Sequence, residues 1–242
     1  MARVVLVHGF TQTGRSWAAI AARLSAVGHD VVCPDAPGHG DAGNVRADLW
    51  QAADHIARAG GRAVYTGYSM GGRIALHLAL SRPDLVTGLV LLGATPGIDD
   101  DGARATRRAD DEARAVELEC DGVAAFLDHW LATPLLASLP RDAAGVGDRL
   151  RNTAAGLADS LRRCGTGQQT PLWSRLAELR MPVLCLAGER DERFTALARR
   201  MADTIGPNAA AEVIAGAGHA AHLEAPDAFA DRLVRFVDEH GS

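Results

Sequence analysis

The stretch that decides the fold is AVYTGYSMGGRIALHLAL, residues 63–80. It opens on a short run rich in β-branched and aromatic residues, typical of a strand, and ends on a run with apolar residues at helical spacing. Between the two runs stands GYSMG, a GxSxG motif centred on Ser69. Its flanking glycines are needed because side chains there would collide with the strand and the helix. We therefore predict a nucleophile elbow, against the alternative of an ordinary tight turn that happens to contain serine.

Strand and helix patterns alternate on both sides of this motif. The predicted strands cover residues 4–7, 31–33, 63–66, 86–92, 183–187 and 211–214, and the predicted helices cover 17–27, 45–59, 70–80, 194–205 and 225–240. Such alternation implies an α/β fold, with a mostly parallel sheet flanked by helices on both faces.

The alternation breaks between about residues 98 and 169, where Ala, Arg, Asp and Leu recur at helical spacing, as in 110–118 and 123–131. We therefore predict an α/β core made of residues 1–97 and 171–242, with a helical lid, residues 98–170, inserted in it.

A catalytic serine needs a base, and the base needs an orienting acid, in the chain order Ser, Asp, His for this arrangement. GERD at 188–191 and GAGH at 216–219 each follow a predicted strand, so both loops reach the carboxyl edge of the sheet, where ligands bind. We predict a triad of Ser69, Asp191 and His219. Glu189 is the other candidate acid, but it lies closer to the strand end and suits a structural role. The plain alternative is a pair of solvated loop acids and a surface histidine.

Backbone N–H groups near the serine are predicted to form an oxyanion hole, which stabilises negative charge on a carbonyl oxygen. Phe10 closes the HGF sequence after the first strand, and Met70 directly follows the serine. We expect His8 to support this loop, and we assign no catalytic role to His39 in PGHG, residues 37–40.

The basic residues are all arginine, 25 in number, against 30 acidic residues, which gives a net charge of −5. The lack of lysine excludes Schiff-base chemistry, a lysine general base and the phosphate loop that depends on a lysine. An acidic chain is a poor match for nucleic acid, so we expect no nucleic-acid partner. A local arginine cluster can still bind a small anion.

The four cysteines, Cys33, Cys120, Cys164 and Cys185, lie far apart without metal-ligand spacing. We expect no zinc site, no other metal, no cofactor and a reducing compartment. Met1 runs almost directly into the first strand, and no apolar run approaches the roughly 20 residues of a membrane span. We therefore expect a cytoplasmic monomer or weak homo-oligomer without a membrane partner.

The motifs together resemble the α/β-hydrolase superfamily over essentially the whole chain. They are HGF at 8–10, DAPGHG at 35–40, GYSMGGR at 67–73, GERD at 188–191 and GAGHAAHLEAP at 216–226. Three longer stretches narrow the resemblance: FLDHWLATPLLASL at 126–139, LRRCGTGQQTPLW at 161–173 and PVLCLAGERDERF at 182–194. The chain looks like a member of the 2-succinyl-6-hydroxy-2,4-cyclohexadiene-1-carboxylate synthase family, because generic esterases have no reason to carry the lid and GTGQQ signatures.

The resemblance implies a cofactor-free lyase of menaquinone synthesis that acts on a small tricarboxylate. In that family a proton leaves a cyclohexene ring, the double bonds shift, and pyruvate departs from an enolpyruvyl group without an acyl-enzyme. By resemblance Ser69, activated by His219 and Asp191, is the base. The N–H groups of Phe10 and Met70 then hold the developing enolate.

The resemblance also implies which residues bind the substrate. The matching positions are Tyr68, Arg73, Arg107, Trp130, Arg151 and Arg193. Arginine suits carboxylates because its guanidinium binds them in a bidentate manner. Arg149 lies close enough to Arg151 for a helical slip to exchange the two, and Arg104 and Arg108 stand beside Arg107 in the same way. Arg193 stands where some members of the family carry lysine.

Two other functions stay open at this point. One is a serine carboxylester or carbon–carbon bond hydrolase that works through an acyl-enzyme. The other is a non-catalytic binding protein on the same scaffold, because a fold does not fix a function. The intact set of Ser69, Asp191 and His219 argues against a binding protein, which needs none of them.

Overall fold

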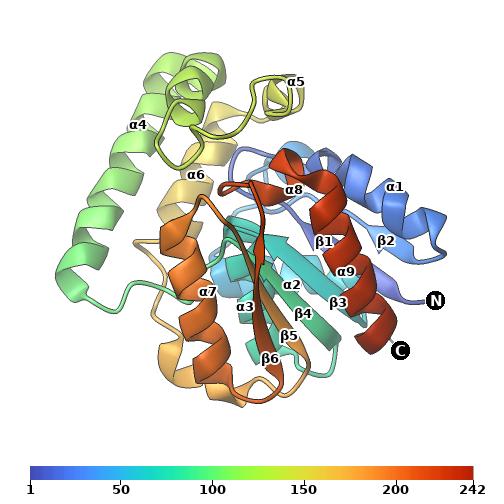
Figure 1. Ribbon diagram of the computed structural model, residues 1–242. Coiled ribbons are helices and arrows are strands. Elements are labelled where there is room, and N and C mark those ends of the chain that lie inside the picture. Colours follow the sequence, from blue (N-terminus) through green and yellow to red (C-terminus); the bar gives the residue numbers. More distant parts are fainter. Residues whose placement is uncertain (242) are drawn as a thin grey trace.

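A parallel sheet forms the centre of the protein, as the computed structural model of residues 1–241 shows (Figure 1). Across the sheet its strands are β2 (Asp30–Val32), β1 (Arg3–Val7), β3 (Ala63–Tyr68), β4 (Val86–Leu92), β5 (Val183–Gly188) and β6 (Ala209–Ile214). Each neighbouring pair is parallel. The predicted α/β fold with its parallel sheet is therefore confirmed.

Helices cover both faces of this sheet, and β1 shows why. Val4 and Leu6 pack into one apolar cluster, and Val5 and Val7 into the other. The first cluster includes α1 (Ala18–Ala26) and α9 (Pro226–His240), and the second includes α2 (Leu49–Gly60), α3 (Met70–Ser81) and α7 (Glu192–Ile205). Because successive strand side chains point to opposite faces, a strand buried on both sides must be apolar throughout.

Local capping sets where α2 begins. The sequence favours a helix from residue 45, but α2 starts after Asp48, whose side chain accepts the Gln51 N–H at 2.9 Å. The Gln51 side chain in turn accepts the Asp48 N–H at 3.0 Å. This capping box satisfies donors that a helix start leaves unpaired, so it fixes the boundary more sharply than apolar spacing does.

Three helices between β4 and β5 make up the predicted lid region. They are α4 (Asp101–Leu131), α5 (Val146–Arg149) and α6 (Ala154–Cys164), and they lie over the carboxyl ends of the strands (Figure 1). The stretches predicted at 110–118 and 123–131 belong to α4, which bends at Gly122 with φ 79° and ψ 173°. A small apolar cluster, separate from the two clusters of the sheet, joins α4 to α6. It includes Leu118, Phe126 and Leu157.

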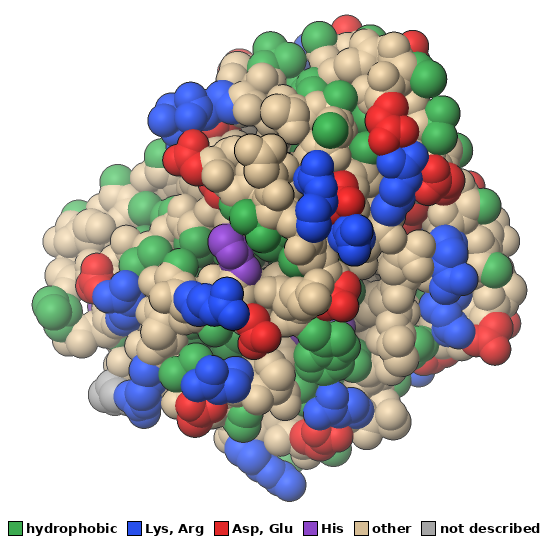
Figure 2. All heavy atoms as spheres, turned by 180° about the vertical axis from the view of Figure 1, so that it is seen from behind, with side chains coloured by type: hydrophobic (Ala, Val, Ile, Leu, Met, Phe, Trp, Pro, Cys, Tyr) green, Lys and Arg blue, Asp and Glu red, His purple; other side chains and the backbone are tan. Residues whose placement is uncertain are grey.

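Acidic and basic side chains are interspersed over the rear face of the molecule (Figure 2). One such group links the lid helices, because Arg162 of α6 pairs with Glu112 and Glu119 of α4. In residues 1–241 no helix combines the length and the apolar character needed to cross a membrane.

Two glycines allow the close approach of strand and helix at the GxSxG motif. A Cβ atom on Gly67 would lie 2.3 Å from the Gly71 carbonyl oxygen, and one on Gly71 would lie 2.2 Å from the Val7 carbonyl oxygen. Both neighbours are backbone atoms and cannot rotate away. The motif therefore requires glycine at both positions for reasons of packing alone.

Gly71→Ala is expected to lower the free energy of unfolding by at least about 1–3 kcal/mol, because α3 must move away from β1 to make room for the methyl group. Urea unfolding followed by circular dichroism measures the effect. Gly147→Ala is the matched control, because a Cβ atom at Gly147 meets no atom within 4 Å. Equal stability of the two variants would contradict this packing argument.

Candidate active site

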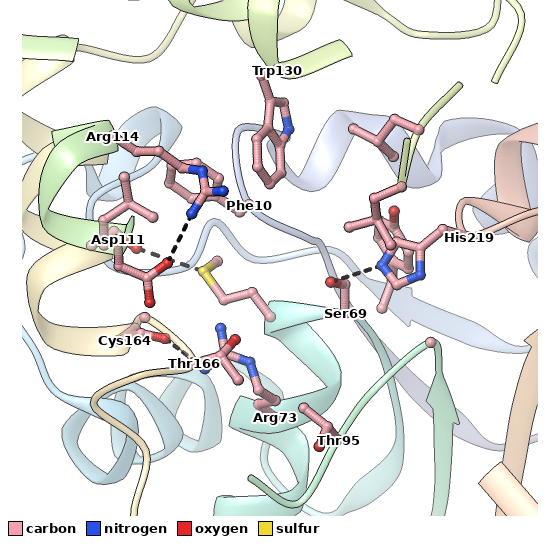
Figure 3. A pocket seen from close by; sticks show the side chains of 18 of the residues that line it. Phe10, Ser69, Arg73, Thr95, Asp111, Arg114, Trp130, Cys164, Thr166 and His219 are labelled. Carbon is pink, nitrogen blue, oxygen red and sulfur yellow. Dashed lines mark hydrogen bonds and ion pairs between the residues drawn. The ribbon is translucent and has the colours of Figure 1, made fainter. Parts of the chain in front are cut away.

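Ser69 stands between β3 and α3 with a left-handed backbone, φ 51° and ψ −109°. A residue other than glycine seldom adopts a positive φ, and such strain gathers at functional sites. The turn presents the serine hydroxyl at the carboxyl end of β3, on the wall of a cavity under the lid (Figure 3). The structure therefore places Ser69 as the nucleophile-elbow prediction requires.

Asp191 and His219 come from the loops after β5 and β6 and meet Ser69 at this edge. His219 Nδ1 lies 2.6 Å from Asp191 Oδ2, and His219 Nε2 lies 3.2 Å from Ser69 Oγ. The rings of Tyr68 and Phe194 pack against the imidazole, with centroids 5.3 and 4.6 Å away. These distances suit a relay in which Ser69 donates to His219 and His219 donates to Asp191.

The other candidate acid, Glu189, makes a structural contact. Its Oε2 accepts the Gly216 N–H at 2.8 Å and so joins the loops after β5 and β6. Glu224 shapes the second of these loops, because its carboxylate accepts the N–H groups of Gly218 and Ala220 at 2.8 and 3.0 Å. Both carboxylates thus hold the backbone on either side of the loop that carries the histidine.

The two residues whose N–H groups are predicted to form the oxyanion hole, Phe10 and Met70, line the same cavity as Ser69. Within residues 1–241 the Phe10 N–H donates no hydrogen bond. Met70 is the first residue of α3, and the first N–H groups of a helix point outward without an intrahelical partner. The helix dipole adds a partial positive charge at the same place, which favours an anion there.

His8 and His39 hold the loop that carries Phe10, and both act as neutral rings. His8 Nε2 accepts the Ala36 N–H at 2.9 Å, and His39 Nε2 accepts the Thr11 N–H at 3.3 Å. An accepting nitrogen is unprotonated, so the other ring nitrogen carries the hydrogen and donates to a backbone carbonyl. Burial lowers the pKa of both histidines, that of His39 to about 3.

The cavity over Ser69 is partly open to solvent and is lined by apolar and polar side chains together, as is usual for small-molecule sites. Its polar and aromatic lining residues include Phe10, Tyr68, Ser69, Arg73, Arg107, Asp111, Arg114, Trp130, Arg149, Phe194 and His219. The four guanidinium groups and the single carboxylate in this set leave a net charge of about three positive units. A protein that is acidic as a whole therefore contains a cationic cavity.

Arg73 enters the cavity from the first turn of α3. Its Nη1 donates to the Cys164 carbonyl at 2.6 Å, and the residue is only 7% exposed. Burial lowers its pKa to about 10, so the guanidinium stays charged near neutral pH. Gln169, at the end of the GTGQQ sequence, approaches the same Nη1 at 3.5 Å.

Asp111 ties α4 to the GTGQQ loop and orients Arg107. One carboxylate oxygen accepts the Arg107 Nε–H at 2.8 Å, and the other accepts the Gly167 N–H at 3.2 Å. A Cβ atom on Gly167 would lie 2.3 Å from the Arg108 nitrogen. Only glycine lets the loop come this close to α4, which explains part of the GTGQQ signature.

The structure corrects the prediction for Arg151. Arg149 lines the cavity, is 3% exposed and donates to the Ala144 carbonyl at 2.7 Å. Arg151 lies outside the cavity with 43% of its side chain exposed, and its nearest carboxylates are those of Asp41 and Asp148 at 4.0 Å. Arg149 is the last residue of α5, and the chain turns after it, so the Arg151 side chain leaves in another direction.

Arg193 is also not among the residues that line the cavity. It is exposed, and its guanidinium lies 5.7 Å from the centre of the Phe194 ring. The neighbouring Phe194 faces the cavity instead and contacts His219. The first turn of α7 thus directs an aromatic ring inward and the cation outward.

Tyr68 and Trp130 both line the cavity, as the resemblance implies. Tyr68 is 4% exposed, and burial raises its pKa, so the phenol keeps its proton and can donate it in a hydrogen bond. The Trp130 Nε1–H is buried and has no hydrogen-bond partner within residues 1–241. Its ring packs edge-on against Phe10, with centroids 5.5 Å apart.

Sequence reasoning missed Arg114, whose side chain faces the cavity between Phe10 and Asp111 (Figure 3). Its Nη1 lies 3.7 Å from Asp111 Oδ1, and the side chain is 33% exposed. Arg107, Asp111 and Arg114 stand at positions i, i+4 and i+7 of α4, which places them on one helix face. That spacing is the signal in the sequence that identifies this residue.

Residues 4–232 match the model of the alpha/beta hydrolase family. A Serratia proteamaculans protein named 2-succinyl-6-hydroxy-2,4-cyclohexadiene-1-carboxylate synthase is 31% identical over 98% of this chain and 94% of its own length. A Bacillus subtilis protein that carries the same name provisionally is 34% identical over 97% of this chain and 89% of its own length.

A solved structure agrees with these relatives. The structure of MenH from S. aureus superimposes with a TM-score of 0.89 at 32% sequence identity. The match covers 98% of this chain and 94% of the other. The likeness extends over the sheet, the lid and the loops that carry the site.

Stability is expected to fall as the pH drops from 7.0 to 5.5. Burial lowers the pKa of His8, His39, His77 and His222, to about 3 for His39 and about 4 for His77. The unfolded chain binds protons at these residues near pH 6.5, while the folded chain does not. Unfolding therefore becomes easier by up to about 1.4 kcal/mol per pH unit for each histidine below that pH.

Urea unfolding at several pH values measures this slope, and the chosen window stays above the range in which carboxylates titrate. A flat profile between pH 7.0 and 5.5 would show that these rings take up protons in the folded state.

Proposed function

The chain belongs to the alpha/beta hydrolase family and, within it, to the 2-succinyl-6-hydroxy-2,4-cyclohexadiene-1-carboxylate synthases, and we propose that it is a lyase of menaquinone synthesis. The substrate is 2-succinyl-5-enolpyruvyl-6-hydroxy-3-cyclohexene-1-carboxylate, which carries three carboxylates. The products are the cyclohexadiene of the family name and pyruvate.

The reaction needs a base and an anion site, and the cavity offers both. The proton on the ring carbon that bears the succinyl group passes to Ser69 Oγ, while the serine proton passes to His219 Nε2. Asp191, 2.6 Å from His219, stabilises the imidazolium that forms. The electron pair of the broken C–H bond forms an enolate of the succinyl ketone, and the N–H groups of Phe10 and Met70 stabilise its oxygen.

Collapse of the enolate completes the elimination. The carbonyl re-forms, and the enolate C=C pair becomes a new ring double bond between C2 and C3. The former C3=C4 pair moves to C4=C5, and the C5–O bond to the enolpyruvyl group breaks, its electron pair leaving on oxygen. The leaving enolate of pyruvate takes up a proton, which the His219 imidazolium can supply. Atoms and electrons balance without a cofactor.

The observation that carries this proposal is the charge of the cavity. Arg73, Arg107, Arg114 and Arg149 line it together with Asp111, which leaves about three positive charges for a ligand with three negative ones. A site for a neutral ester would gain nothing from such a set, because each buried cation loses hydration. The free Nε1–H of Trp130 adds a donor for the same ligand.

The purified protein is expected to release pyruvate from the enolpyruvyl substrate, as a coupled lactate dehydrogenase assay measures. Ser69→Ala is expected to lower kcat by at least about 10³-fold, because it removes the atom that takes the ring proton. Absence of pyruvate release from the wild-type protein would refute the proposed reaction. A burst with an activated ester, together with acylation of Ser69 during turnover, would support the hydrolase alternative.

Arg114→Gln is expected to raise KM about 10- to 100-fold and to leave kcat within about threefold, because a charge-assisted contact to a substrate carboxylate is lost. Arg114 suits this test better than Arg73, whose buried guanidinium also holds the Cys164 carbonyl. Steady-state pyruvate release over a range of substrate concentrations separates the two constants.

Arg163→Gln is the matched control for Arg114→Gln. It removes one positive charge from α6, where Arg163 pairs with Asp159 and is 49% exposed. A surface pair of this kind contributes little to stability. If both variants raised KM equally, the effect would come from net charge, and Arg114 would not contact the substrate.

A further inference from the structure

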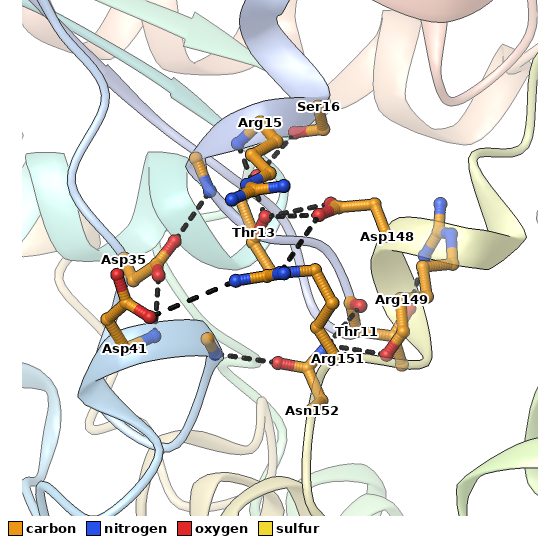
Figure 4. Close-up of polar contacts among 12 residues, drawn as sticks. Thr11, Thr13, Arg15, Ser16, Asp35, Asp41, Asp148, Arg149, Arg151 and Asn152 are labelled. Carbon is orange, nitrogen blue, oxygen red and sulfur yellow. Dashed lines mark hydrogen bonds and ion pairs between the residues drawn. The ribbon is translucent and has the colours of Figure 1, made fainter.

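Three segments that lie far apart in the sequence meet behind the oxyanion hole (Figure 4). They are the turn at residues 9–12, the loop at 35–43 and the lid segment at 148–152. The turn carries Phe10, whose N–H faces the cavity in the proposed mechanism. Thr11, the residue after Phe10, forms hydrogen bonds to both of the other segments.

Thr11 has an unfavourable backbone conformation. The Gln12 N–H donates to the Gly9 carbonyl at 3.2 Å, which closes a four-residue turn, and Thr11 sits at its third position with φ 67°. Turns with a positive φ at this position favour glycine or asparagine. A β-branched residue is strained there, so the surrounding structure must hold it in place.

Every polar group of Thr11 has a partner, and the residue is fully buried. Its N–H donates to His39 Nε2 at 3.3 Å, and its carbonyl accepts the Asn152 Nδ2–H at 2.7 Å. Its hydroxyl contacts the Arg149 guanidinium. The energy of this backbone strain is similar to the energy of one buried hydrogen bond. Loss of a single hydrogen-bond partner is therefore enough to make another backbone conformation of Thr11 more stable.

Asn152 is the residue that joins all three segments. Besides the Thr11 carbonyl, its Nδ2 donates to the Arg149 carbonyl at 3.0 Å, and its Oδ1 accepts the Gly40 N–H at 2.8 Å. The residue is 6% exposed, and its amide has no open position toward the cavity. Thr153, directly after it, caps α6 by accepting the Gly156 N–H at 3.1 Å. The asparagine is therefore anchored to a helix start and does not touch the substrate.

We propose that Asn152 is a positioning residue of the oxyanion hole, which holds Thr11 in its left-handed conformation and so keeps the Phe10 N–H directed at the reacting oxygen. Without the Asn152 amide, the buried Thr11 carbonyl loses its donor and Thr11 relaxes to a negative φ. The turn then changes type and Phe10 shifts away from Ser69. The inference rests on the proposed use of the Phe10 N–H, which serves a lyase and a hydrolase alike.

The test uses Asn152→Ala and Asn152→Asp in the full-length protein. The aspartate variant keeps an acceptor for the Gly40 N–H but turns the donor toward Thr11 into a second acceptor, so it remains informative if the alanine variant fails to fold. For both, kcat for pyruvate release is expected to fall about 10- to 100-fold with KM within about threefold, since loss of an oxyanion-hole donor lowers kcat by about 10²–10³.

A second readout does not depend on the natural substrate. The rate at which a fluorophosphonate labels Ser69 also depends on the oxyanion hole, and it is expected to fall in parallel with kcat. If wild-type protein labels rapidly yet releases no pyruvate, the proposed lyase function fails while the role of Asn152 is still tested by labelling alone.

Thr11→Gly supplies the rescue, because glycine adopts φ 67° without strain. The double variant Thr11→Gly/Asn152→Ala is expected to be labelled at least tenfold faster than Asn152→Ala alone. Asn208→Ala is the matched control: the Asn208 amide likewise donates to two backbone carbonyls, those of Leu179 and Met181 at 3.1 and 2.6 Å, far from the cavity. It is expected to lower Tm and to leave both rates unchanged.

Two results would overturn the proposal. One is a folded Asn152→Ala or Asn152→Asp protein with wild-type kcat and labelling rate. The other is a loss that Thr11→Gly does not restore, because that would mean that Asn152 only stabilises the fold. A parallel loss of activity in Asn208→Ala would count as a form of this second result, because it would likewise mean that the asparagine only stabilises the fold.

Discussion

The strained turn at Ser69 is the constraint on which the rest of the site depends. Its left-handed backbone holds the hydroxyl at the carboxyl end of β3, but only because Gly67 and Gly71 let α3 approach β3 and β1 almost to backbone contact. The same turn starts α3 at Met70, so one local geometry positions the proposed base, one proposed oxyanion donor and the positive end of a helix dipole. His219 and Asp191 then need only reach this edge of the sheet.

A second requirement concerns the four arginines that line the cavity, because the protein must stabilise their charges in a partly closed space. Three of the four arginines meet it by binding a backbone carbonyl or a carboxylate: Arg73 binds Cys164, Arg107 binds Asp111, and Arg149 binds Ala144. Each of these guanidinium groups has further N–H donors beyond that one contact. The segment between β4 and β5 therefore supports these charges, and its GTGQQ sequence contributes the Gly167 N–H, which binds Asp111, and the Gln169 side chain, which approaches Arg73.

Local rules explain why much of the fold could be predicted. Strand limits followed from apolar runs that are buried on both faces, and the elbow followed from one motif in its strand–helix setting. The helix start at α2 was missed because a capping box at Asp48 overrides apolar spacing. The two stretches predicted at 110–118 and 123–131 lie on either side of the bend at Gly122.

The sequence by itself determined the parallel α/β core, the serine at the elbow and the loops that bring an acid and a histidine to it, because these depend on residues adjacent in the chain and on the rule that parallel strands end at one edge. Only the tertiary structure decided which of the candidate arginines face the cavity. Arg149 points inward and Arg151 outward, and Arg114 completes the cationic set while Arg193 does not. The physical reason is rotation: neighbouring positions on a helix differ by about 100° in direction, and only packing against the core fixes which of them faces the cavity.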